Sequence, residues 1–286
     1  MTDQGPPKGE AFETARGLFL ACKEVETFIR ETVLPQFSDE KLSDDVSGMF
    51  YGQLLRAYAW IHTITKLDEP FDFQAVAAGA RALLETAIDM VLLRANPSDV
   101  ARVVAWEESE RFKHAQAIER YYQALSAPPV GHEPAVQFAK GMKARIERLR
   151  LRQGWKSKNG KARHPDRWTG RHLDEDAKRA DDCGHTFKFS NFYETEYRQV
   201  CWMVHGSGFV HRRVSAEFFP AIGGMLYRPC ADLATLCAEL AIRQVLGWSA
   251  THEAAFGDLR TRTILVAGVN RRLAMGEAPF PEVPRR

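Results

Sequence analysis

The sequence lacks any long uncharged run. None of the uncharged stretches in this 286-residue chain reaches the roughly 18 residues that a membrane-spanning helix needs. The first ten residues, MTDQGPPKGE, contain no apolar core of the kind that marks a secretory signal. We therefore expect a protein without a membrane segment or a signal peptide.

Cysteine is also scarce, and several catalytic motifs are missing. The five cysteines form no CxxC pair and are odd in number, which argues against a disulfide framework or a structural zinc site. The chain contains no G-x4-G-K-S/T phosphate loop and no G-x-S-x-G nucleophile elbow. These absences indicate a reduced, cytoplasmic protein with free thiols, and we expect no metal and no cofactor.

What remains is an ordinary globular composition, with 45% apolar and 27% charged residues. Apolar positions recur at helical spacing, no segment alternates like a strand, and no repeat has a fixed period. We predict an all-α helical bundle that forms a single domain over residues 1–275, with a flexible tail over residues 276–286. The expected helices cover residues 11–34, 46–67, 73–94, 99–125, 134–152, 174–182, 191–205, 229–248 and 251–273.

The net charge of +2 hides an uneven distribution. Residues 140–171 contain twelve Lys or Arg residues and two acids, a balance of +10 that leaves −8 for the rest of the chain. We expect residues 140–172 to form a basic helix and loop inserted within the domain. A local excess of this size is typical of a surface that binds phosphate or nucleic acid, although many basic faces are only solvated.

Aromatic residues lie among the cations of this basic loop. Trp168 stands near Lys161, Arg163 and Arg171 in the sequence. Bases of single-stranded RNA stack on aromatic rings while cations contact the backbone, so these four residues are candidate RNA-binding residues. The alternative for Trp168 is that its ring anchors the loop onto the bundle.

The segment from Tyr193 to Gly208 carries the most informative pattern. On a helix, four ionisable side chains fall within about 60° of one another. These are Glu194, Arg198, Cys201 and His205. Four apolar or aromatic side chains gather on a different face, where we expect them to contact the core: Tyr193, Tyr197, Val200 and Val204.

Arg198 and His205 together suit chemistry at a phosphate. Arginine offers a fixed fork of donors to phosphate oxygens, and histidine titrates near neutral pH. Cleavage of RNA by its own 2′-hydroxyl needs a group that moves a proton and a cation near the phosphorus. Ser207 and its two flanking glycines leave room for a phosphate beside the backbone. A purely structural role for the Arg–His pair is the alternative.

A second polar stripe runs along the helix expected at residues 73–94 and includes Arg81 and Glu85. If this stripe faces the helix of Arg198 and His205, Glu85 is the natural partner of one of them, because a buried carboxylate must be paired. Glu85 would then orient the catalytic histidine. The alternative is a solvated face.

The spacing of Arg198 and His205 fits the R-x4–6-H pattern of the HEPN superfamily. The longer pattern from Tyr193 to His205 resembles the Y-x3-Y-R-x2-S-x3-H signature of an uncharacterised bacterial all-helical family related to that superfamily. The upstream R-x3-E helix of that family is matched by Arg81 and Glu85, and its W-S/T-G loop by residues 168–170. Two positions differ: Cys201 replaces a serine, and Gln199 stands where catalytic HEPN proteins often carry Asn, Asp or His.

The resemblance implies a helical bundle that dimerises, so that two Arg–His motifs meet and cut RNA without a metal. We therefore expect a HEPN-like endoribonuclease of the toxin or phage-defence type, with Arg198, His205 and Glu85 as catalytic residues. Further substrate-binding residues are expected at Arg81, Glu194, Cys201, Trp202 and Ser207. Expected partners are RNA or a nucleotide, a second copy of the chain and a cognate antitoxin. The alternative is a non-catalytic helical module that binds a nucleotide, RNA or a protein.

Overall fold

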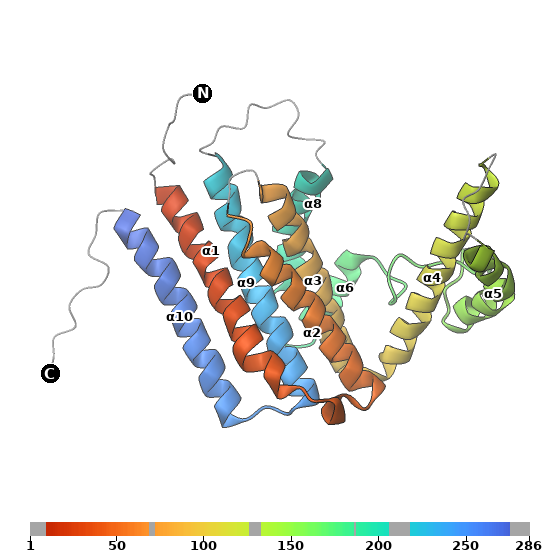
Figure 1. Ribbon diagram of the computed structural model, residues 1–286, viewed down its shortest axis with the longest axis horizontal. Coiled ribbons are helices and arrows are strands. Elements are labelled where there is room, and N and C mark those ends of the chain that lie inside the picture. The colour runs from red at the N-terminus through yellow and green to blue at the C-terminus, as the bar shows by residue number, and fades with distance from the viewer. Residues whose placement is uncertain (1–9, 69–71, 126–132, 186, 206–217, 275–286) are drawn as a thin grey trace. The chain divides into compact units, whose positions relative to one another are not determined.

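The computed structural model describes residues 10–68, 72–125, 133–185, 187–205 and 218–274 (Figure 1). Within these ranges the regular structure is helical, and the strand-like pairing is limited to an isolated antiparallel bridge between Lys156 and Ala162. The predicted all-α class is confirmed. No helix in the described ranges combines the length and the apolar character needed to cross a membrane.

The chain forms two compact units rather than the single domain expected over residues 1–275. The main unit comprises residues 1–94 and 180–286, and the inserted unit comprises residues 95–179. The expected insertion, residues 140–172, is therefore only part of a larger unit. The physical reason is that the helix expected at residues 99–125 packs against the basic helix that follows it.

The main unit is a bundle of long helices, with shorter helical turns between them. Its helices are α1 (Glu10–Phe28), α2 (Asp45–Ile64), α3 (Phe73–Ala95), α7 (Phe189–Phe192), α8 (Arg198–His205), α9 (Phe218–Val245) and α10 (Ala250–Ala274). The turns are η1 (Ile29–Val33), η2 (Leu34–Gln36), η3 (Asp39–Leu42) and η6 (Tyr193–Tyr197). Helix α1 packs against α9 and α10, and α2 packs against α9 (Figure 1).

Helix α3 supplies much of the core of the main unit. Fourteen of its residues are buried, including Leu83, Leu84 and Ile88. Small residues let neighbouring helices approach closely: a Cβ added at Gly79 would lie 2.7 Å from Ile64 Cδ1 on α2. Because α3 is buried on most of its surface, its few polar side chains have to find partners within the protein.

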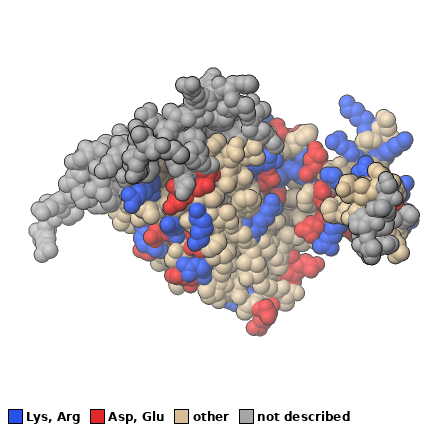
Figure 2. All heavy atoms as spheres, turned by 45° about the horizontal axis from the view of Figure 1, so that its top comes forward, with Lys and Arg blue, Asp and Glu red and all other residues tan. Residues whose placement is uncertain are grey.

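The inserted unit contains η5 (Pro97–Asp99), α4 (Val100–Gln123), α5 (Glu133–Arg152) and most of α6 (Leu173–Asp181). Helices α4 and α5 pack through a small apolar cluster of Phe112, Ala115 and Ile146, with Met142 and Leu149 beside it. The solvent side of this pair is strongly charged, and Figure 2 shows lysine and arginine side chains gathered around it.

Three expected helices differ in the structure. The helix expected at residues 11–34 is α-helical only as far as Phe28 and continues as the π-helix η1. The helix expected at residues 229–248 begins eleven residues earlier, at Phe218, and contains Pro229 in its interior. The helix expected at residues 191–205 is interrupted, because η6 is a π-helix between α7 and α8. The expected tail, residues 276–286, lies outside the described residues.

Substitution of leucine at Gly79 is expected to destabilise the main unit. The new side chain has to enter the contact between α3 and Ile64, and overpacking of this kind costs about 1–3 kcal/mol. The matched control is Gly52→Leu in α2, where an added Cβ meets nothing within 4 Å. There the helix propensity of leucine should raise the free energy of unfolding by up to about 1 kcal/mol. Urea denaturation of both variants measures the difference, and equal midpoints would contradict this account.

Candidate functional site

The π-helix η6 changes which residues of the candidate segment share a face. Its hydrogen bonds run from residue i to i+5, so each turn holds more residues than an α-helical turn. The angular spacing derived for an unbroken helix therefore does not apply over Tyr193–Tyr197, although Glu194 and Arg198 still lie on the same side and form an ion pair. Tyr197 and Val200 are buried, as expected for the core-facing stripe, and the side chain of Arg198 is 65% exposed.

Tyr197 contacts the polar stripe of α3. Its hydroxyl donates a hydrogen bond of 2.9 Å to Glu85 Oε1, which also accepts one of 3.0 Å from Arg81 Nε. Burial and the nearby Glu85 carboxylate raise the pKa of Tyr197, so the phenol stays protonated and remains the donor. Burial, the largest single cause, lowers the pKa of Arg81, but the hydrogen bond to Glu85 and the nearby acidic groups together outweigh it, and the net shift is upward. The cluster thus consists of the Arg81–Glu85 ion pair and the neutral phenol of Tyr197, which donates to the same carboxylate.

The two tyrosines of the segment connect this cluster to Arg198. Tyr193 and Tyr197 stack, with ring centroids 4.9 Å apart and planes inclined by 21°. Arg81 lies over the Tyr197 ring at 5.6 Å, and Arg198 lies over the Tyr193 ring at 5.9 Å. Arg198 also pairs with Glu194 at 3.1 Å. The site thus presents two arginines around a pair of stacked phenols.

The sequence predicts that Glu85 contacts Arg198 or His205. In the structure it contacts Tyr197 and not Arg198, and the His205 alternative rests on a side chain outside the described residues. The α3 stripe does face the candidate segment, but the π turn leaves Arg198 on the solvent side. Cys201 is half-buried and lies near enough to contribute to the raised pKa of Tyr197. All five cysteines are free thiols. The side chains of Trp202 and His205, and the whole of Ser207, lie outside the described residues.

The tryptophan of the W-T-G loop is an anchor and not a stacking platform. Trp168 is 4% exposed, and its carbonyl accepts a 2.9 Å hydrogen bond from Arg102 Nε on α4. Thr169 Oγ1 donates to the buried Asp176 carboxylate at 2.7 Å. Gly170 has φ +76°, a conformation that side-chain-bearing residues rarely adopt. A buried ring offers no face to a base, so the expectation that Trp168 stacks on RNA is corrected.

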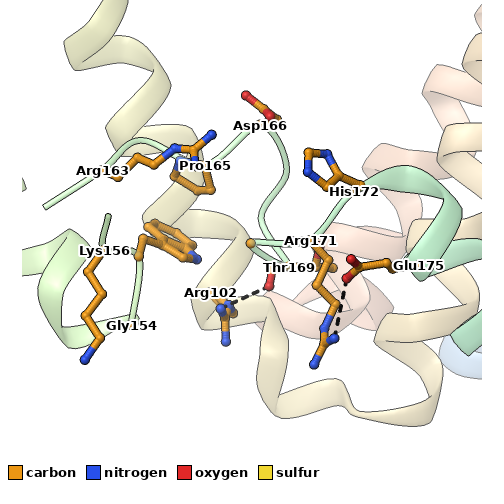
Figure 3. A pocket seen from close by; sticks show the side chains of 12 residues that line it. Arg102, Gly154, Lys156, Arg163, Pro165, Asp166, Thr169, Arg171, His172 and Glu175 are labelled. Carbon is orange, nitrogen blue, oxygen red and sulfur yellow. Dashed lines mark hydrogen bonds and ion pairs between the residues drawn. The ribbon is translucent and has the colours of Figure 1, made fainter. Parts of the chain in front are cut away.

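The remaining loop candidates are cations near the surface. Lys161, Arg163 and Arg171 are all exposed. Arg171 faces Glu175 at 3.6 Å, and Lys161 closes a tight turn in which its carbonyl accepts from Ser157 N at 2.8 Å. Arg163 lines a hollow of the inserted unit together with Arg171, whereas Lys161 does not (Figure 3).

A hydrogen-bond chain in the inserted unit escaped the sequence analysis. Arg150 Nε donates to Ser109 Oγ at 2.7 Å, Ser109 Oγ lies 2.9 Å from His164 Nδ1, and His164 Nε2 contacts Glu110. A His164 ring protonated at Nε2 satisfies all three contacts. Ser109 is fully buried and already accepts from Arg150, so the chain clamps the basic loop to α4 and α5 and is no nucleophilic triad. No local pattern reveals it, because His164 is 55 residues from Ser109.

Lowering the pH below about 6.5 should destabilise the inserted unit through His164. Burial lowers the pKa of His164, and the bond to Glu110 opposes this without reversing it. The unfolded chain therefore takes up the proton first, so this stabilisation is complete above about pH 6.5 and is lost as the pH falls. Thermal melts at several pH values should show a flatter pH dependence for His164→Asn than for the wild type. His172→Asn, at an exposed histidine of the same loop, should keep the wild-type slope, and equal slopes in both variants would refute the assignment.

Comparisons with known proteins place this arrangement in a family. Within the described ranges, no group of three or more His, Cys, Asp or Glu side chains is placed to hold a metal ion. Neither the curated proteins nor the solved structures contain a match to the chain. A family model matches residues 48–217, a span that includes the Arg81–Glu85 pair, the W-T-G loop and the segment from Tyr193 to His205. The chain therefore belongs to DUF5677, a family of unknown function.

Proposed function

We propose that the chain is a HEPN-like, metal-independent endoribonuclease in which Arg198 binds the scissile phosphate and His205 transfers a proton. The observation that carries the proposal is the placement of both residues in α8, where they are the first and last positions of one α-helix. Seven α-helical steps return to nearly the same face, about 20° away, and advance roughly 10 Å. The π-helix lies before Arg198 and leaves this relation unchanged.

The surroundings of Arg198 suit a residue that exchanges one anion for another. Its partner Glu194 is also exposed, and the ion pair measures 3.1 Å. Pairs of this kind contribute only about 0.2–1 kcal/mol, so a phosphate can displace the carboxylate. The Tyr193 ring below the guanidinium holds it in place without neutralising its charge.

The proposed reaction is an internal transfer at phosphorus. The 2′-oxygen attacks the adjacent phosphorus while the bond to the 5′-oxygen breaks, and the products are a 2′,3′-cyclic phosphate and a 5′-hydroxyl. One group accepts the 2′-hydroxyl proton and another donates a proton to the leaving oxygen. A homodimer, implied by the HEPN resemblance, supplies a second histidine for the second transfer. Arg198 stabilises the charge that builds on the phosphate oxygens.

In this scheme Glu85 is a positioning residue. Its carboxylate holds Tyr197, which stacks on Tyr193, and Tyr193 in turn supports Arg198. Arg81 pairs with Glu85 at 3.0 Å and completes the same cluster. The chain of contacts links the R-x3-E pair on α3 to the Y-x3-Y-R segment in a single support for the phosphate-binding arginine.

Loss of Arg198 or His205 should abolish most of the cleavage. With purified protein and a labelled single-stranded RNA in EDTA, Arg198→Ala and His205→Ala should each lower the rate by about 10²–10⁴. Arg198→Lys keeps the positive charge but loses the paired donors of the guanidinium, so its rate should lie between that of the wild type and that of Arg198→Ala. The control is Arg228→Ala, since Arg228 is 77% exposed on α9 and faces Asp232 at 3.7 Å. Equal rates in all variants, or no cyclic phosphate product, would end the proposal.

One observation favours a second candidate function, a non-catalytic module that binds RNA, a nucleotide or a protein such as a cognate antitoxin. Gln199, next to Arg198, is exposed at the position where catalytic HEPN proteins often carry Asn, Asp or His. A glutamine cannot transfer a proton as Asp or His can, and its side chain is one methylene longer than that of Asn, which alters how this position arranges the site. RNA that binds in the same assay without being cut, with weaker binding in the Arg198→Ala variant, is the result expected of this alternative.

A further inference from the structure

The inserted unit contains a hollow of about 390 Å³ that the proposed reaction does not use. It lies between α4, the turn that follows α5, and the W-T-G loop with the start of α6 (Figure 3). All of its lining residues belong to the inserted unit. Neither Arg198 nor His205 is among them.

Hydrogen bonds fix the two walls of the hollow. On one side, Arg163 N donates to Trp155 O at 2.9 Å, and Lys156 and Ala162 form an antiparallel β-bridge. Together these contacts close a tight hairpin turn. On the other side, Arg102 donates to Trp168 O at 2.9 Å and to Thr169 O at 3.1 Å. The hollow is thus a preformed concavity, as expected of a small-molecule site, and its volume falls in the range of about 300–1,000 Å³ typical of such sites.

The charges around the hollow are only partly neutralised. Four Lys or Arg residues and two acids line it. Arg102 is occupied by backbone carbonyls, and Arg171 faces Glu175. Lys156 and Arg163 are exposed, and no dashed line joins either of them to another residue drawn in Figure 3. These two cations are available for an anion.

The hollow also borders a buried donor that lacks an acceptor. Trp155 is 4% exposed, and its Nε1 has no hydrogen-bond partner among the described residues. Gly170 covers this edge of the ring so closely that an added Cβ would lie 3.1 Å from Trp155 Cδ1. Buried donors are rarely left without a partner, and an oxygen of a bound ligand would supply one after a small shift of the loop.

We propose that this hollow binds a nucleoside 5′-phosphate. The phosphate would lie at Arg163, whose guanidinium supplies charge-assisted hydrogen bonds. The exposed Lys156 side chain, which points away from Arg163 in Figure 3, would turn toward the bound phosphate. Asp166 and Glu175 repel a phosphate but accept hydrogen bonds from ribose hydroxyls or a base amino group. A lone phosphate would leave most of the volume empty, and the buried tryptophans offer no face for base stacking. The mixed lining therefore matches a nucleotide better than either a free anion or a stacked strand.

Isothermal titration of the full chain with AMP, adenosine and inorganic phosphate tests the proposal. AMP should bind, and adenosine and inorganic phosphate should each bind at least about tenfold more weakly, because each lacks half of the contacts. A short RNA with a 5′-phosphate, compared with its 5′-hydroxyl form, separates a strand end from a free nucleotide as the source of the same group. Preference for the 5′-phosphate form assigns the site to strand ends, and tighter binding of AMP than of either form assigns it to free nucleotides.

Two matched double variants provide the control for charge. Lys156→Ala with Arg163→Ala should weaken AMP binding by about tenfold to a hundredfold. Arg152→Ala with Lys158→Ala removes the same charge, one arginine and one lysine, from nearby exposed positions that do not line the hollow. This pair should leave the affinity within about twofold. Circular dichroism melts of both pairs establish that they are folded.

The indole N–H resonance of Trp155 gives a readout that does not depend on affinity. Its peak, assigned by its loss in Trp155→Phe, should move on addition of AMP in the wild type and in the Arg152/Lys158 variant. The proposal is overturned if AMP fails to bind at millimolar concentration, if both double variants weaken binding equally, or if inorganic phosphate binds as tightly as AMP.

Discussion

The arrangement of the candidate site depends on one carboxylate that is held between distant parts of the chain. Glu85 on α3 accepts hydrogen bonds from Arg81 on the same helix and from Tyr197, which follows 112 residues later. A carboxylate withdrawn from water is tolerated only when its lost hydration is replaced, and these two donors replace it. These bonds hold Tyr197 against α3. Because Tyr197 is the last residue of η6 and directly precedes α8, its position also sets where these two elements lie.

The π-helix is the local consequence of this anchoring. Tyr197 is both stacked on Tyr193 and bonded to Glu85, while Val200 is buried in the core. The wider turn of η6 allows Tyr197 to make its contacts with Tyr193 and Glu85 while Val200 stays buried. Arg198 then lies toward solvent at the start of a regular α-helix. π-Helical turns are often found at functional sites for this reason, since they redirect a side chain without ending the helix.

Another carboxylate, that of Asp176, plays the corresponding part in the inserted unit. Asp176 is fully buried and accepts from Arg167 Nε at 2.8 Å, Thr169 Oγ1 at 2.7 Å and Arg179 Nη1 at 3.3 Å. These bonds fasten the W-T-G loop to α6, and Arg102 fastens the same loop to α4. The loop contains little apolar surface for a core, so polar contacts to one buried acid hold its shape. That shape forms one wall of the hollow.

By itself, the sequence determined the all-α class, the approximate helices, the shared polar stripe of Arg81 and Glu85 and the buried stripe of Tyr197 and Val200. These follow from periodicity and short spacings, which act within one helix. Tertiary structure alone decided that Glu85 meets Tyr197 and not Arg198, that Trp168 is buried, and that His164 joins Ser109. It also decided that residues 95–179 form a unit of their own. Each of these depends on contacts between residues far apart in the chain, where burial selects the partner and no local spacing records the choice.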